Sequence, residues 1–134
     1  MAVEYPPLAV RSATVPRTRA QDDLVVLWAA WKAAAFYVQT LDQPIVAVPV
    51  WDHAYAGARQ VLDAAATRLT TWKGPYSPAA SLQLRELRDV LIAYLSLAEE
   101  SVAACNWNAS MAYLWKAGII TYAWATAFGL EVYP

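Results

Sequence analysis

The chain has 134 residues, about the size of one domain, and a net charge of −1 at neutral pH. Hydrophobic residues make up 59% of it and charged residues only 16%, against about 25% charged residues in an average soluble domain. This balance excludes a generally basic nucleic-acid-binding protein, although it leaves room for a local basic surface. The single cysteine, Cys105, excludes an internal disulfide.

Residues 1–20 are expected to form an extended N-terminal arm. Its prolines interrupt helix and bias the residues before them towards extended backbone: Pro6, Pro7 and Pro16. Its arginines outnumber its single glutamate: Arg11, Arg17 and Arg19. Residues 1–10 lack the basic start and apolar stretch of a signal peptide. Two interpretations of the arm stay open, a disordered terminus and a segment that becomes ordered on a partner.

Residues 21–134 predict one all-α domain, a four-helix bundle. The expected helices cover residues 22–41, 51–73, 78–105 and 108–129. Asp22 or Asp23 is expected to cap the first helix, because an acidic side chain suits the positive end of the helix dipole. Asn108 is expected to cap the fourth helix, and Gly129 to end it.

The second and third helices show the spacing of a bundle seam. Apolar residues recur at intervals of mostly four and three, namely Trp51, Tyr55, Ala58, Leu62, Ala65, Leu69 and Trp72, then Leu84, Leu87, Leu91, Tyr94, Ala98 and Val102. Between the first two helices, Pro44 and Pro49 predict an extended crossing over residues 42–50.

The first and fourth helices have little polar surface, since Lys32 and Lys116 are almost their only charges. We therefore expect neighbouring subunits to cover both helices. The predicted interface consists of their aromatic residues: Trp28, Trp31, Phe36, Tyr113, Trp115, Tyr122, Trp124 and Phe128. Two alternatives stay open: a soluble homo-oligomeric bundle with a pocket for an apolar or aromatic small molecule, and a membrane-associated helical protein. Against the membrane alternative, Lys116 near the centre of a span would cost about 2.5–3.5 kcal/mol.

The sequence contains no catalytic or metal-binding pattern. His53 is the only histidine, and adjacent helical residues point about 100° apart, so Asp52 is poorly placed to orient His53 towards Cys105. A metal site in a bundle needs Glu-x-x-His pairs from several helices, which Glu99 and Glu100 cannot supply. We therefore predict a protein that is not an enzyme and has no metal or cofactor. We also predict a solvated face for the two glutamates and an inert core position for Cys105.

The cations suggest a local positive surface. The predicted phosphate contacts are Arg11, Arg17, Arg19, Arg59, Arg68, Lys73, Arg85 and Arg88. The alternative is scattered solubility charge with local acidic partners such as Asp63, Glu86 and Asp89.

An arm that carries RSATVPRTRA, followed by an alanine-rich and aromatic-rich bundle, resembles in layout the major coat proteins of rod-shaped and filamentous archaeal viruses. In that family two copies, or two related chains, pair and wrap linear double-stranded DNA in A form, and the dimers stack into a helical virion. The resemblance covers the whole chain and implies that the arm reaches towards DNA or a neighbouring subunit. The net charge departs from the pattern, since it is low for a protein that coats a polyanion.

The resemblance thus implies a self-assembling virion coat subunit that holds DNA through its phosphate backbone, without base reading. The expected partners are further copies or a paralogous coat chain, together with non-specific double-stranded DNA, and a membrane envelope stays open. The expected location is the virion, or the cytoplasm if the chain is the ligand-binding bundle instead.

Overall fold

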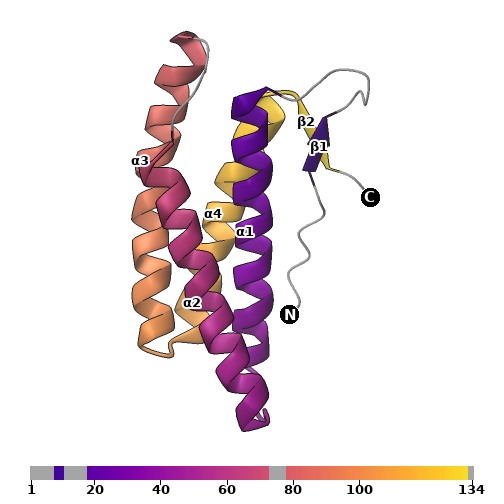
Figure 1. Cartoon of the computed structure of the whole chain (residues 1–134), viewed down its shortest axis with the longest axis vertical. Helices are drawn as coiled ribbons and strands as arrows, with labels where there is room; N and C mark the ends of the chain where they lie inside the picture. The colour runs from indigo at the N-terminus through magenta and orange to yellow at the C-terminus, as the bar shows by residue number, and fades with distance from the viewer. Residues whose placement is uncertain (1–7, 11–17, 73–77, 133–134) are drawn as a thin grey trace.

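A computed structural model describes residues 8–10, 18–72 and 78–132 of the chain. Its four helices are α1 (Arg19–Leu41), α2 (Val48–Thr70), α3 (Pro78–Ala103) and α4 (Trp107–Ala127). The helices run alternately down and up, and each packs against the next, with α4 closing the ring against α1 (Figure 1). The prediction of an all-α four-helix bundle is confirmed.

The two seams predicted from the spacing of apolar residues form much of the core. The following seam residues are buried: Ala58, Leu62, Ala65 and Leu69 on α2, and Leu84, Leu87, Leu91, Ala98 and Val102 on α3. The aromatic members of the seams, Trp51, Tyr55, Trp72 and Tyr94, are half-buried. Each buried leucine adds roughly 1.5–3 kcal/mol to folding, so the seams are a main source of stability.

Helices α1 and α4 are joined at the centre of the bundle by a tryptophan. The side chain of Trp31 is fully buried, and its indole Nε1 donates a hydrogen bond of 2.9 Å to the hydroxyl of Thr121. That hydroxyl in turn donates to the carbonyl of Ala117 at 2.7 Å. Because an unpaired buried N–H costs about 1–3 kcal/mol, this bond helps to set how α1 and α4 align.

Helix α1 begins earlier than predicted, and its N-cap is Thr18 instead of Asp22 or Asp23. The hydroxyl of Thr18 accepts from the backbone N–H of Gln21 at 3.2 Å, and the Gln21 side chain accepts from the N–H of Thr18 at 3.0 Å. This reciprocal capping box satisfies two donors that a helix end leaves open. The arm of residues 1–20 therefore ends sooner than expected, and Arg19 belongs to the first turn of the helix.

Two further helix starts also differ from the prediction. Helix α2 starts at Val48, so Pro49 lies in its first turn, where proline is tolerated because that N–H has no partner inside the helix. The extended crossing is therefore shorter than the predicted 42–50. Helix α4 is capped by Asn106 and not by Asn108, because the Asn106 side chain accepts from the N–H of Ala109 at 3.2 Å.

The turn from α3 to α4 explains why the prediction for Cys105 was wrong. Cys105 is exposed and has a φ of 55°, in the left-handed region that glycine favours. Its N–H bonds to the carbonyl of Val102, and the N–H of Asn106 bonds to the carbonyl of Ser101. This pair of bonds is a Schellman ending, so Cys105 serves to stop α3 and has no place in the core.

Two short strands lie beside the bundle. β1 (Leu8–Val10) pairs antiparallel with β2 (Leu130–Val132), with Ala9 opposite Glu131. The described part of the N-terminal arm is thus extended and hydrogen-bonded to the chain's own C-terminal segment (Figure 1). The sequence did not predict β2. Gly129, with a φ of 84°, makes the turn from α4 into it.

Candidate functional site

Large apolar side chains are exposed on the outer side of two adjacent helices. Phe36 on α1 is 65% exposed, and on α4 Trp115 is 52%, Ile119 46% and Tyr122 42% exposed. We call these four residues the outer face. Isolated exposed apolar residues are ordinary, but a group of this size on neighbouring elements indicates a surface that another molecule covers.

The register between α1 and α4 sets the levels of these residues along the bundle axis. The two helices run antiparallel (Figure 1). The ring centroid of Trp28 lies 5.8 Å from that of Tyr122. Phe36 follows Trp28 along α1, and Trp115 precedes Tyr122 along α4. Because the helices are antiparallel, Phe36 and Trp115 come to about the same level along the bundle axis. Trp115, Ile119 and Tyr122 follow one another at intervals of four and three, so they share one side of α4.

A depression of about 300 Å³ lies next to Phe36 on the outer side of α1. Its lining consists of Ala29, Lys32, Ala33, Phe36 and Tyr37. These residues also recur at helical spacing, so the depression runs along α1. The small side chains of Ala29 and Ala33 beside the exposed ring of Phe36 give this side of α1 both a depression and a protrusion. Such a surface can pack against a second helix.

The structure divides the predicted interface aromatics into three groups. Trp28 and Trp31 are buried inside the single chain, so they were wrongly predicted to be subunit contacts. Three others are half-buried: Tyr113, Trp124 and Phe128. Phe36, Trp115 and Tyr122 belong to the outer face. Sequence reasoning missed Ile119, whose exposure follows from its place one turn after Trp115.

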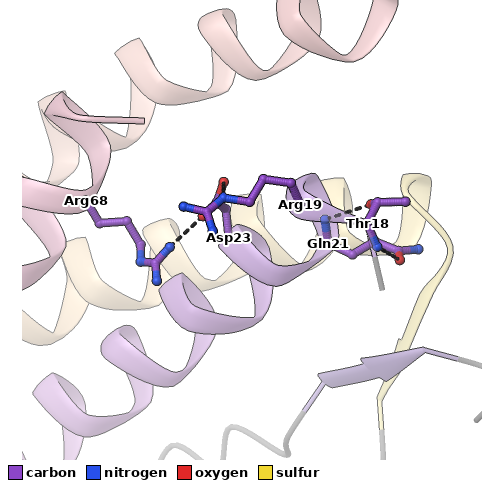
Figure 2. A network of polar contacts seen from close by, with 5 residues as sticks. All are labelled: Thr18, Arg19, Gln21, Asp23 and Arg68. Carbon is purple, nitrogen blue, oxygen red and sulfur yellow. Dashed lines mark hydrogen bonds and ion pairs between the residues drawn. The ribbon is translucent and has the colours of Figure 1, made fainter. Parts of the chain in front are cut away.

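Two of the predicted phosphate-binding arginines meet at one carboxylate. Asp23 is buried, with a side chain 2% exposed, and its Oδ1 accepts from Arg68 Nη1 at 2.5 Å. Arg19 approaches the other oxygen, with its Nε 3.7 Å from Oδ2. Figure 2 shows Arg19 reaching Asp23 along α1 and Arg68 reaching it from α2. Asp23 was predicted as a helix cap; its structural role is to join the start of α1 to the end of α2.

Three other predicted phosphate contacts among the described residues lie elsewhere on α2 and α3. Arg59 donates to the hydroxyl of Tyr55 at 3.0 Å and lies 5.7 Å from the centre of that ring. Arg88 has Asp89 as an ion-pair partner at 3.7 Å, and Arg85 is exposed. The remaining predicted contacts lie outside the described residues, namely Arg11, Arg17 and Lys73.

Arg59 also lies in an acidic neighbourhood, because it acts electrostatically on Glu99 together with Asp63. Partial burial raises the pKa of Glu99, the negative charge of Asp63 raises it further, and Arg59 lowers it. One carboxylate oxygen of Glu99 is buried without a hydrogen-bond partner among the described residues. The prediction of a solvated face is therefore wrong for Glu99, whereas Glu100 is exposed as expected.

The described residues offer little for catalysis or metal binding. His53 and Asp52 are exposed, and the His53 ring packs edge-on against Tyr37, with ring centroids 6.1 Å apart. Within residues 8–10, 18–72 and 78–132, no group of three or more potential metal ligands occurs. Over the same residues, α1 alone is long and apolar enough to cross a membrane, a test that a buried core helix also passes.

The fold thus defines the class of the protein as a four-helix bundle with an apolar outer face. Comparison of the chain with protein-family models, curated proteins and solved structures gives no match.

Proposed function

We propose that the chain is a self-assembling structural subunit whose outer face packs against further copies of itself. The single observation that carries this proposal is the exposure of Phe36, Trp115, Ile119 and Tyr122 on two adjacent helices. Burying large apolar side chains releases about 25 cal/mol per Å² of surface, so leaving this group in water is costly. A second copy offers a matching surface, because a two-fold interface pairs the same patch with itself.

The form of assembly that we propose is that of a virion coat subunit, packed into a helical filament around double-stranded DNA. This finer proposal is supported by the layout of an arm and an aromatic-rich helical bundle, and by the arginines that the chain carries despite its net charge of −1. Each subunit of a filament needs only a few phosphate contacts, because assembly makes the contacts multivalent. Among the described residues, two of the predicted phosphate contacts are exposed and lie outside the acidic neighbourhood of Glu99, namely Arg19 and Arg85.

The proposal of self-assembly is tested by measuring the size of the protein in solution. Sedimentation velocity and negative-stain imaging of the wild-type chain are expected to show assemblies, and the paired change Phe36→Ser and Trp115→Ser is expected to weaken association at least tenfold. The matched control is Leu82→Ser on α3, where an equally exposed apolar side chain, 67% exposed, lies outside the outer face. A wild-type chain that stays monomeric, or a double variant that assembles as the control does, would contradict the proposal.

The finer proposal has a separate test. Assemblies recovered from their source are expected to contain nuclease-protected double-stranded DNA, and DNA binding is expected to fall steeply as the salt concentration rises. Replacing the three arginines Arg11, Arg17 and Arg19 by alanine is expected to reduce the salt dependence, since each lost phosphate contact lowers its slope by about one. DNA binding that is unchanged in this variant would show that the arm is not part of the DNA interface. Assemblies free of nucleic acid would rule out the proposed function as a coat around DNA.

A further inference from the structure

A polar pocket of about 270 Å³ lies between the start of α1 and the end of α2, on a different part of the bundle from the outer face. It is lined by Arg19, Asp23, Ala64, Thr67, Arg68, Thr71 and Trp72. Two arginines and one aspartate are its ionisable residues, so the lining carries one net positive charge. The function proposed above uses Arg19 as one exposed cation and makes no use of Arg68, so it does not bring the two arginines into one site.

The buried carboxylate of Asp23 brings the two guanidinium groups together (Figure 2). A guanidinium has five N–H donors, and the ion pairs with Asp23 are made through Nη1 of Arg68 and Nε of Arg19. Both side chains are also partly open to solvent, with 50% of Arg19 and 33% of Arg68 exposed. Asp23 therefore holds both arginines, each of which has more donors than one carboxylate can accept, and both side chains line the pocket.

Trp72 adds a donor of a different kind. Its indole Nε1 is buried and has no hydrogen-bond partner among the described residues, although a buried N–H left unpaired costs about 1–3 kcal/mol. Trp72 follows the end of α2 and lines the same pocket as the two arginines. The start of α1, at Arg19, also contributes the positive end of its helix dipole. Two arginines, a tryptophan whose N–H is unpaired within the described part of the chain, and the positive end of a helix dipole thus lie around one hollow.

We propose that this pocket binds a phosphate group, with Arg19 and Arg68 as charged donors and the Trp72 indole as a neutral donor. A phosphate carries several acceptor oxygens, and arginine binds such oxygens in a fork of two parallel hydrogen bonds. The phosphate group belongs either to a nucleic-acid backbone or to a free phosphate ion. This inference rests on the proposed coat function only for the first of these two sources.

The test is a calorimetric titration of the full chain with inorganic phosphate at low ionic strength. Wild-type protein is expected to bind with a dissociation constant of about 1 mM or lower. Arg19→Gln is expected to weaken binding about tenfold, and Trp72→Phe about threefold, because each removes donors while keeping much of the side-chain volume. Arg59→Gln is the matched control. It removes the same charge from an exposed arginine away from the pocket and is expected to change affinity less than twofold.

Arg68→Gln is unsuitable here, because it removes a close ion-pair partner of the buried Asp23 and endangers folding. Circular dichroism of Arg19→Gln and Trp72→Phe establishes that they fold. No saturation of wild-type protein at about 10 mM phosphate, or equal affinities of Arg19→Gln and Arg59→Gln, would overturn the pocket.

The source of the phosphate is decided by competition with a short DNA duplex. If the duplex displaces phosphate from wild-type protein and binds more weakly to Arg19→Gln, the pocket holds the nucleic-acid backbone. If phosphate binds and the duplex does not displace it, the pocket is specific for the free ion, and the coat proposal loses this contact. If the protein does not self-assemble, sedimentation and imaging show this, and the phosphate titration can still be interpreted by itself.

Discussion

Replacing Arg68 by leucine is expected to destabilise the fold strongly, because it removes a close partner of a charge in the interior. The side chain of Asp23 is 2% exposed, and Arg68 is its close partner at 2.5 Å. After Arg68→Leu, Asp23 loses this partner, while Arg19 still approaches it at 3.7 Å. Leucine preserves much of the apolar stem of arginine, so the change reports mainly on charge.

Removing one partner of a buried ion pair costs about 3–5 kcal/mol, and the lower end applies here because Arg19 remains. For a chain of 134 residues the entropy of unfolding near 60 °C is about 0.28 kcal/mol per kelvin, so a loss of about 3 kcal/mol lowers Tm by about 10 °C. Asp23→Asn removes the buried charge itself. The double variant that combines Asp23→Asn with Arg68→Leu is therefore expected to be more stable than Arg68→Leu alone, by about 1–2 kcal/mol.

The assay is urea unfolding followed by tryptophan fluorescence, at one fixed protein concentration because self-association shifts apparent stability. Arg59→Leu is the control on the same helix, and as a surface change it is expected to alter stability by no more than about 0.5 kcal/mol. A double variant less stable than Arg68→Leu, or an Arg68→Leu effect no larger than that of the control, would refute the reasoning that the charge of Asp23 is buried and depends on Arg68.

Three smaller predictions concern single positions. Cys105→Gly is expected to raise the free energy of unfolding by about 0.5–1 kcal/mol, because Cys105 holds a positive φ of 55° that glycine adopts without strain; a lower urea midpoint would contradict this. Glu99→Gln is expected to raise Tm at neutral pH and to lose this effect in acid. Folding raises the pKa of Glu99 above its usual value of 4.5, so the stability that Glu99 contributes is fully present below pH 4.5 and is lost as the pH rises through the folded-state pKa. Equal gains in Tm at all pH values would contradict this prediction. Gly57→Ala is expected to cost about 1–3 kcal/mol, because the new Cβ would lie 2.6 Å from Cζ of Tyr37; the loss should shrink in a Tyr37→Ala background, as thermal unfolding would show.

The outer face, which we propose to join copies, and the pocket, which we propose to bind phosphate, are on different parts of one bundle. The outer face lies on α1 and α4, whereas the pocket lies between α1 and α2. Contact between copies through the outer face therefore leaves the pocket open. A subunit built in this way can join its neighbours and hold a phosphate group at the same time, as an assembly around a phosphate-bearing polymer requires.

The four helices followed from local pattern alone. Apolar residues at intervals of four and three predicted the buried stripes of α2 and α3, because helical periodicity depends on neighbouring residues only. The start of α1 was also present in the sequence, since Thr18 and Gln21 have the spacing of a capping box. The aspartates that follow were preferred in the prediction, although the reciprocal pair satisfies more backbone donors.

The candidate sites depended on contacts between residues far apart in the chain. Asp23 meets Arg68 across 45 positions, and Trp31 meets Thr121 across 90. Because no local pattern encodes such pairings, Trp31 was taken for a subunit contact and Asp23 for a helix cap. The sequence by itself determined where the chain is helical and which stripes are apolar. Tertiary packing decided which apolar side chains are left facing outwards and which arginines share a carboxylate, since both depend on how the helices align.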